Sequence, residues 1–98
     1  MRLFDFIMDS KVATCLFEIN KRPNLPIDVY SVYLKAFLPE EVSSRWIVDT
    51  IDLMSEYKLV HYSHSNNSIS LTPDAVFISG LLGRIRAECE DIEESLEV

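Results

Sequence analysis

The hydrophobic pattern of this chain changes its period once, near Leu59. From Val42 to Leu59, apolar residues recur every three or four positions, which predicts a helix with one buried face. From Val60 to Thr72, apolar and polar residues alternate in two short runs around a polar tip at residues 65–67, which predicts two strands joined by a turn. The sequence therefore predicts a long helix that leads directly into a β-hairpin.

Shorter helices are predicted before this long one. Residues 3–8 have the spacing of one or two amphipathic turns, and Asp9 or Ser10 offers an N-cap for a helix at about 11–21. The inner face of that helix is predicted to consist of Val12, Cys15, Leu16 and Ile19. Pro23 and Pro26 then end it, with Leu25 between them.

The next helix is predicted at about 29–37, capped by Asp28, and the long helix at about 40–58. The inward residues of the 29–37 helix are predicted to be Val29, Val32, Tyr33 and Phe37. Glu40 and Glu41 in the first turn of the long helix, and Lys58 at its other end, suit the helix dipole.

The segment 73–98 is predicted to form one further helix, with Thr72 as its N-cap and Pro73 at its first position. Apolar residues repeat along it with alternating spacings of three and four, which is a heptad seam. The seam consists of Ala75, Ile78, Leu82, Ile85, Cys89, Ile92 and Leu96. We expect its first half to close the core and its second half to project and pair with a second copy, so that Ile78 to Leu96 form a homodimer interface. Parallel and antiparallel pairing both remain open, although Arg86 opposite Glu93 favours the antiparallel one.

Composition indicates a single, mainly α-helical domain with a small β-hairpin. The 98 residues are 48% hydrophobic and include only two glycines, which is unlike a disordered chain. The opening residues lack the unbroken apolar run of a signal peptide or membrane span. Cys15 and Cys89 lie far apart and fit neither a disulfide framework nor a metal site, so a cytoplasmic location without membrane contact is expected.

The net charge of −7 is concentrated in the C-terminal part of the chain. Residues 1–58 carry a balance of −2 and residues 59–98 a balance of −5, and six acids lie between Glu88 and Glu97. Proteins that bind phosphates tightly usually carry a net positive charge, whereas residues 1–58 are nearly neutral. Charge alone therefore indicates weak contact with nucleic-acid backbones.

Two short motifs resemble the winged helix-turn-helix domains of regulators of the PadR and MarR kind. Residues 56–60 are similar to the "glutamate, x, glycine, leucine, valine" sequence that ends their recognition helices, with Tyr57 and Lys58 where the family usually has its turn glycine. Residues 71–74 are similar to the "leucine, threonine, proline, acid" entry to the helix after the wing. The resemblance covers nearly the whole chain and implies a winged-helix body at 1–72 followed by a C-terminal dimerisation helix at 73–98. It also implies that Leu25 adds a minimal third strand to the hairpin.

The resemblance implies a dimeric regulator that binds double-stranded DNA through the front of the long helix. Arg45 is the strongest candidate base reader, because a guanidinium can make a bidentate contact to guanine. The implied contacts to bases are Ser43, Ser44, Arg45, Trp46 and Val48, and those to phosphate or the minor groove are Lys35, Lys58, His64, Asn66 and Asn67. Trp46 is alternatively a core residue.

Three carboxylates support a second hypothesis. Asp49, Asp52 and Glu56 follow Arg45 at helical spacing and would repel a phosphate backbone. The alternative is an acidic winged-helix module that docks on a basic protein partner and does not itself bind DNA. His61 and His64 are best interpreted as polar hairpin residues, and no cofactor is expected. No set of nucleophile, general base and orienting group can be recognised from the spacing of residues in the sequence, so an enzyme is not expected.

Overall fold

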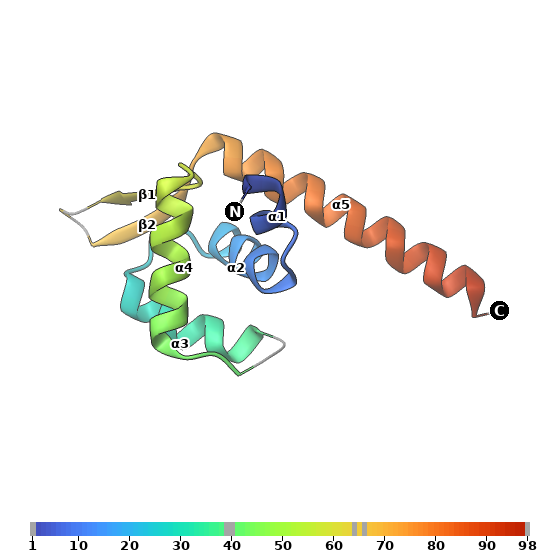
Figure 1. Cartoon of the computed structure of the whole chain (residues 1–98), viewed down its shortest axis with the longest axis horizontal. Helices are drawn as coiled ribbons and strands as arrows, with labels where there is room; N and C mark the ends of the chain where they lie inside the picture. Colours follow the sequence, from blue (N-terminus) through green and yellow to red (C-terminus); the bar gives the residue numbers. More distant parts are fainter. Residues whose placement is uncertain (1, 39–40, 64, 66, 98) are drawn as a thin grey trace.

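The chain forms five helices and a two-stranded hairpin within the residues that the structure, a computed structural model, describes: 2–38, 41–63, 65 and 67–97. Helix α1 (Leu3–Ile7) and helix α2 (Ser10–Lys21) come first, followed by α3 (Ile27–Phe37) and α4 (Ser44–Glu56). Strands β1 (Val60–Ser63) and β2 (Ser68–Leu71) then pair as the hairpin, and α5 (Pro73–Leu96) ends the chain (Figure 1). A mainly helical fold with a small antiparallel hairpin is confirmed.

Helix α2 is the centre of the core and contacts α1, α3, α5 and β2. Its N-cap is Asp9, whose Oδ1 accepts a hydrogen bond from the Lys11 backbone N–H at 2.8 Å. The predicted inner face is confirmed, because all four of its side chains are buried: Val12, Cys15, Leu16 and Ile19.

The predicted inner face of α3 was wrong at three of its four residues, and only Tyr33 is partly buried against the core. Two residues that the sequence placed inward are exposed on this helix, Val29 and Val32, and Phe37 is about half exposed. The fully buried residues are Tyr30 and Leu34 instead. The helix begins at Ile27 and carries no side-chain cap, so Asp28 lies inside its first turn and is not the N-cap.

Helix α4 begins later than predicted, at Ser44, because Ser43 is its N-cap and accepts a hydrogen bond from the Trp46 backbone N–H at 3.0 Å. Glu41 therefore lies before the helix and not in its first turn, and Glu40 lies outside the described residues. The buried face of α4 is formed by Ile47, Ile51 and Met54.

The junction between α4 and the hairpin is a left-handed helix cap. Lys58 has φ 60°, its N–H donates to the Ser55 carbonyl at 3.0 Å, and the Leu59 N–H donates to the Met54 carbonyl at 2.8 Å. These two bonds form a Schellman motif, in which buried Leu59 and Met54 supply the usual apolar contact. A left-handed conformation of this kind favours glycine, although this chain has lysine at the position.

The hairpin receives the expected third strand as one bridge between Leu25 and Ile69. The Asn24 N–H donates to the Ile69 carbonyl at 2.9 Å and the Ile69 N–H donates to the Leu25 carbonyl at 3.0 Å. The fully buried Tyr30 donates its hydroxyl proton to the Arg22 carbonyl and accepts from the Leu25 N–H at 3.3 Å. These bonds attach the hairpin to the end of α2.

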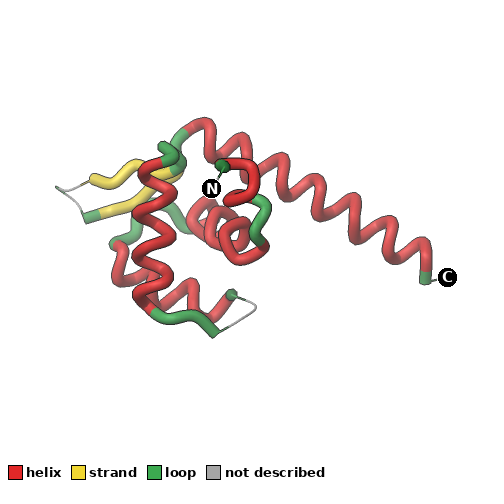
Figure 2. The backbone as a smooth tube through the Cα atoms, in the orientation of Figure 1, coloured by secondary structure: helices red, strands yellow, loops and turns green. Residues whose placement is uncertain are grey.

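Helix α5 lies across α2 and then leaves the body (Figure 2). Thr72 is its N-cap, with Pro73 in the first turn, as predicted. Ala75 is buried and Ile78 and Leu82 are partly buried against the core, whereas every described residue from Arg84 onward is exposed. The molecule consequently measures 52 × 27 × 26 Å, and the end of α5 extends away from the other helices in Figure 1.

Candidate nucleic-acid interface

The outer face of α4 carries most of the predicted DNA contacts that lie in a helix. Ser44 and Arg45 are exposed, Val48 is partly exposed, and Ser43 is exposed but uses its hydroxyl to cap the helix. α4 and the hairpin lie on the side of the body away from the free end of α5 (Figure 1). This arrangement leaves the first turn of α4 open to a large ligand.

The Arg45 side chain is 87% exposed, and its Nε lies 3.6 Å from Asp49 Oδ2 one turn later. Exposed pairs at this spacing contribute only about 0.3–0.5 kcal/mol, so the guanidinium exchanges this partner readily. A bidentate contact to guanine is worth about 1–3 kcal/mol of base discrimination, which exceeds the cost of releasing Asp49.

Trp46 takes the core position that the sequence left open, and not a place beside Arg45. Its ring is partly buried against the core, and the Lys11 Nζ lies 5.4 Å from the ring centroid. Trp46 also lines a hollow together with Phe6 and Leu53. Its contacts are with α1 and α2, which places the indole away from the open face of α4.

The remaining predicted contacts are dispersed around this face. Lys35 on α3 and Lys58 after α4 are exposed. Asn67 at the hairpin tip is exposed, with φ 51°, and its Oδ1 accepts a hydrogen bond from the Tyr62 hydroxyl. His64 and Asn66 lie outside the described residues.

Three carboxylates occupy the same face, as the sequence predicted. Asp49, Asp52 and Glu56 are all exposed. Asp52 also borders a hollow of about 330 Å³ between α4 and β1, whose lining includes Ile51 and Tyr62. The α4 face therefore offers one cation at its start and three anions along its length.

Two exposed features were missed by the sequence analysis. Val32 stands out from α3, and Phe37 borders a hollow between α2 and α5. A second apolar stripe along the same helix, formed by Ile27, Tyr30, Leu34 and Leu38, was equally visible in the sequence and is the one that packs inward.

Cys15 is buried, and burial, with a smaller effect of the Asp9 charge, raises the pKa of its thiol to about 12. The thiol is consequently protonated and unreactive near neutral pH. Within the described part of the chain, no group of three or more His, Cys, Asp or Glu is placed to hold a metal ion. None of the described helices is both long enough and apolar enough to cross a membrane.

Comparison with known proteins gives no relative: no family model, no curated protein and no solved structure matches this chain.

Proposed function

We propose that this chain is a winged helix-turn-helix regulator that binds double-stranded DNA as a dimer. The observation that carries the proposal is the open first turn of α4, with Arg45 at its outer face, on the side of the body that also presents the hairpin (Figure 1). An α-helix with its side chains is about 10–12 Å across, and the major groove is about 12 Å wide. In this binding mode Arg45 reads a guanine, Ser44 and Val48 contact neighbouring base edges, and the hairpin lies on the backbone.

Phosphate contacts are few in this arrangement. In this binding mode the exposed Lys35 and Lys58 neutralise phosphates in each copy, and the exposed Asp49, Asp52 and Glu56 oppose them. Four neutralised phosphates per dimer correspond to a slope of about −4 for log K against log salt, because each contributes about −0.9. The binding mode predicts base readout at two half-sites with a weak backbone contribution.

The test is enrichment of binding sites from random duplex DNA, followed by fluorescence anisotropy over a salt series. Arg45→Ala is expected to weaken binding to the enriched site by roughly 10- to 100-fold per half-site, because each copy loses one bidentate guanine contact. The matched control is Arg84→Ala, which removes an equal charge from an exposed position on α5. Equal affinities of the two variants would exclude Arg45 as the base reader.

A second candidate function rests on the three exposed carboxylates and the hollow beside Asp52. In this alternative the α4 face docks on a basic protein, with an apolar side chain of the partner in the hollow and its cations against Asp49 and Asp52. The double variant Asp49→Lys, Asp52→Lys separates the two functions by the sign of its effect. If the α4 face binds DNA, the variant is expected to bind DNA more tightly and with a steeper dependence of affinity on salt. If the face docks on a basic protein, the variant is expected to lose that partner, and the wild-type chain is expected to bind no DNA even at low salt.

A further inference from the structure

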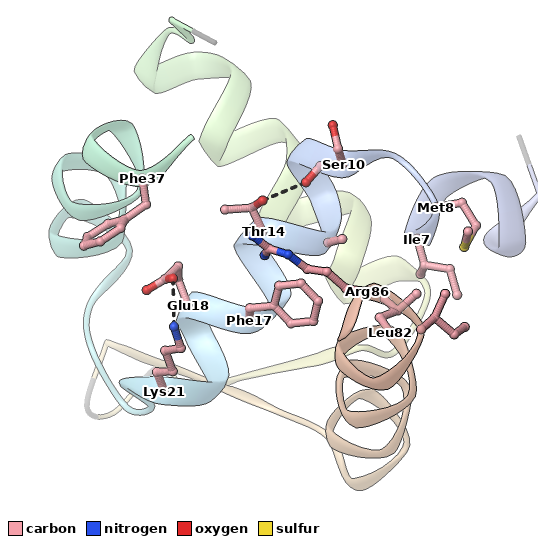
Figure 3. Close-up of a pocket in the computed structure, with 12 residues that line it drawn as sticks. Ile7, Met8, Ser10, Thr14, Phe17, Glu18, Lys21, Phe37, Leu82 and Arg86 are labelled. Atoms are coloured by element: carbon pink, nitrogen blue, oxygen red, sulfur yellow. Dashed lines mark hydrogen bonds and ion pairs between the residues drawn. The ribbon is translucent and has the colours of Figure 1, made fainter. Parts of the chain in front are cut away.

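A hollow of about 640 Å³ opens between α2 and the middle of α5, and α1 and the end of α3 border it (Figure 3). We refer to it as the α2–α5 groove. Its polar members include Glu18, whose carboxylate accepts a hydrogen bond from Tyr33 at 3.1 Å and lies 3.5 Å from Lys21 Nζ. Its apolar lining is formed by Ile7, Met8, Phe17, Phe37, Leu82 and Ile85. Glu18 already has two partners, and the larger part of the groove surface is apolar.

The exposed half of the heptad seam begins at this groove. Leu82 and Ile85 line it, and the next seam residues along α5 continue outward from the body. Ile85 is 53% exposed, Ile92 58% and Leu96 79%. An apolar stripe that starts in an apolar hollow and continues along an uncovered helix indicates one continuous surface that requires a single partner.

We infer that this surface binds the α5 helix of a second copy, with the free end of each helix packed against the α2–α5 groove of the other copy. The inference deepens the dimer in the proposed function by naming its interface, and it does not depend on DNA binding. Each copy offers one free helix end and one groove, so a reciprocal exchange about a two-fold axis satisfies both and closes the assembly at two copies.

The seam spacing gives the register of the exchange. An antiparallel crossing between Cys89 and Ile92 places each of these residues opposite the other one in the second copy. The same register sets Leu96 of one copy against Ile85 of the other, which is the seam residue at the groove. In this register the last turn of each α5 packs against the α2–α5 groove of the other copy.

Charge favours this antiparallel exchange over a parallel coiled coil of the two helix ends. Residues 88–98 contain six acids and no Lys or Arg, and a parallel pair would place Glu88 near Glu93. The groove contributes Lys21, which pairs with Glu18, and Arg86, whose Nε lies 3.2 Å from Glu90 Oε1 in an exposed pair of the same helix. The Arg86 side chain extends from α5 toward α2 (Figure 3). In the antiparallel register, Arg86 of each copy faces the acidic end of the other helix.

The size of the interface also favours the groove as part of the contact. The exposed seam between Ile85 and Leu96 is about 17 Å long at 1.5 Å per residue, which makes only four layers of a two-stranded coil. Such a short coil buries less than the roughly 1,200 Å² that a specific protein interface requires. Aromatic residues of the groove, Phe17 and Phe37, supply the additional apolar area.

The test measures the molar mass of the full chain by light scattering coupled to size exclusion, at tens of micromolar protein and without DNA. The wild-type chain is expected at twice its 11.3 kDa monomer mass. The double variant Ile92→Glu, Leu96→Glu and the single variant Phe37→Glu are each expected at the monomer mass, because they alter opposite sides of the same contact. The matched control is Phe77→Glu, which changes an exposed phenylalanine outside the groove and is expected to stay dimeric.

Two outcomes would overturn the inference. A monomeric wild-type chain would exclude the exchange, and a Phe37→Glu chain that remains dimeric would show that the helix ends pair without the groove. Far-UV circular dichroism verifies that each variant is folded, and Met8→Glu, at another half-exposed groove position, replaces Phe37→Glu if that variant unfolds. Arg45→Ala is expected to remain dimeric, so a failure of DNA binding and a failure of this interface are distinguished.

Discussion

The two halves of α5 share one heptad seam but have different surroundings. Ala75 and Ser79 in the first half are buried against the body, whereas Ile92 and Leu96 in the second half are exposed. The seam residues of both halves are similarly spaced, and the difference lies in what stands opposite: α2 covers the first half, and no described element of the chain covers the second. An apolar stripe indicates that a helix face will be buried. Because α5 is longer than the body it packs on, the chain buries only the first part of this stripe by itself.

The largest expected difference between the regions is in thiol reactivity, because each region carries one cysteine. Cys15 is buried with its pKa raised to about 12, and Cys89 is exposed. At pH 8 and at dilutions that favour the monomer, Cys89 is expected to react with a thiol reagent at least ~10³-fold faster than Cys15. Mass spectrometry of each labelled peptide over time measures the two rates. Similar rates would show that the Cys15 thiol is accessible to the reagent and would contradict its burial in the core.

Truncation of one isoleucine in each region is expected to separate their stabilities. Ile19→Ala removes a fully buried side chain of α2 and is expected to lower the free energy of unfolding by about 2–5 kcal/mol. Ile92→Ala, in the exposed half of α5, is expected to change it by less than about 0.5 kcal/mol when the chain is monomeric. Urea unfolding at low protein concentration measures both. Equal losses would show that the end of α5 packs on its own body.

Tyr30→Phe tests the attachment of the hairpin inside the packed region. The substitution keeps the ring but removes the hydroxyl that bonds the Arg22 carbonyl and the Leu25 N–H. Two partly buried backbone groups lose this partner, so the free energy of unfolding is expected to fall by about 1–3 kcal/mol. The control is Tyr62→Phe, whose hydroxyl bonds Asn67 at an exposed site and whose loss is expected to cost less. A larger loss for Tyr62→Phe in urea unfolding would contradict this order.

The smallest expected effect is at the α4–hairpin junction. Lys58 has φ 60°, a left-handed conformation that costs a residue with a side chain about 1–2 kcal/mol. Glycine removes this strain but loses about 0.5–1 kcal/mol of backbone entropy, so Lys58→Gly is expected to stabilise the fold by less than about 1 kcal/mol. Lys35→Gly, within α3, is the matched control and is expected to destabilise by about 1 kcal/mol. Thermal unfolding that lowers the midpoint for both variants would refute the strain argument.

Much of the fold was predictable where one local pattern had a single interpretation. The hairpin followed from alternation after Leu59, and the start of α5 followed from Thr72 and Pro73, because strand period and helix caps are properties of neighbouring residues. The inner face of α2 followed from one clear apolar stripe. Helix α3 has two apolar stripes, and the sequence prediction chose the one that is exposed at every position except Tyr33.

The candidate site was less predictable than the fold. Arg45, Asp49, Asp52 and Glu56 lie on the exposed face that their spacing implied. The position of Trp46 depended on whether α1 and α2 lay beside the start of α4, which is a contact between distant parts of the chain. The Arg45→Ala variant and the Asp49→Lys, Asp52→Lys variant distinguish DNA binding from protein docking at this face.

By itself the sequence determined the helices, the hairpin, the acidic end and the apolar seam of α5, since each depends on residues within a few turns of one another. Only the tertiary structure decided which side of α3 is buried, that Trp46 faces the core, and that Leu82 and Ile85 continue into a groove with Phe17 and Phe37. The physical reason is that burial depends on which surfaces come into contact, and the local sequence around a residue does not specify which distant element will pack on it.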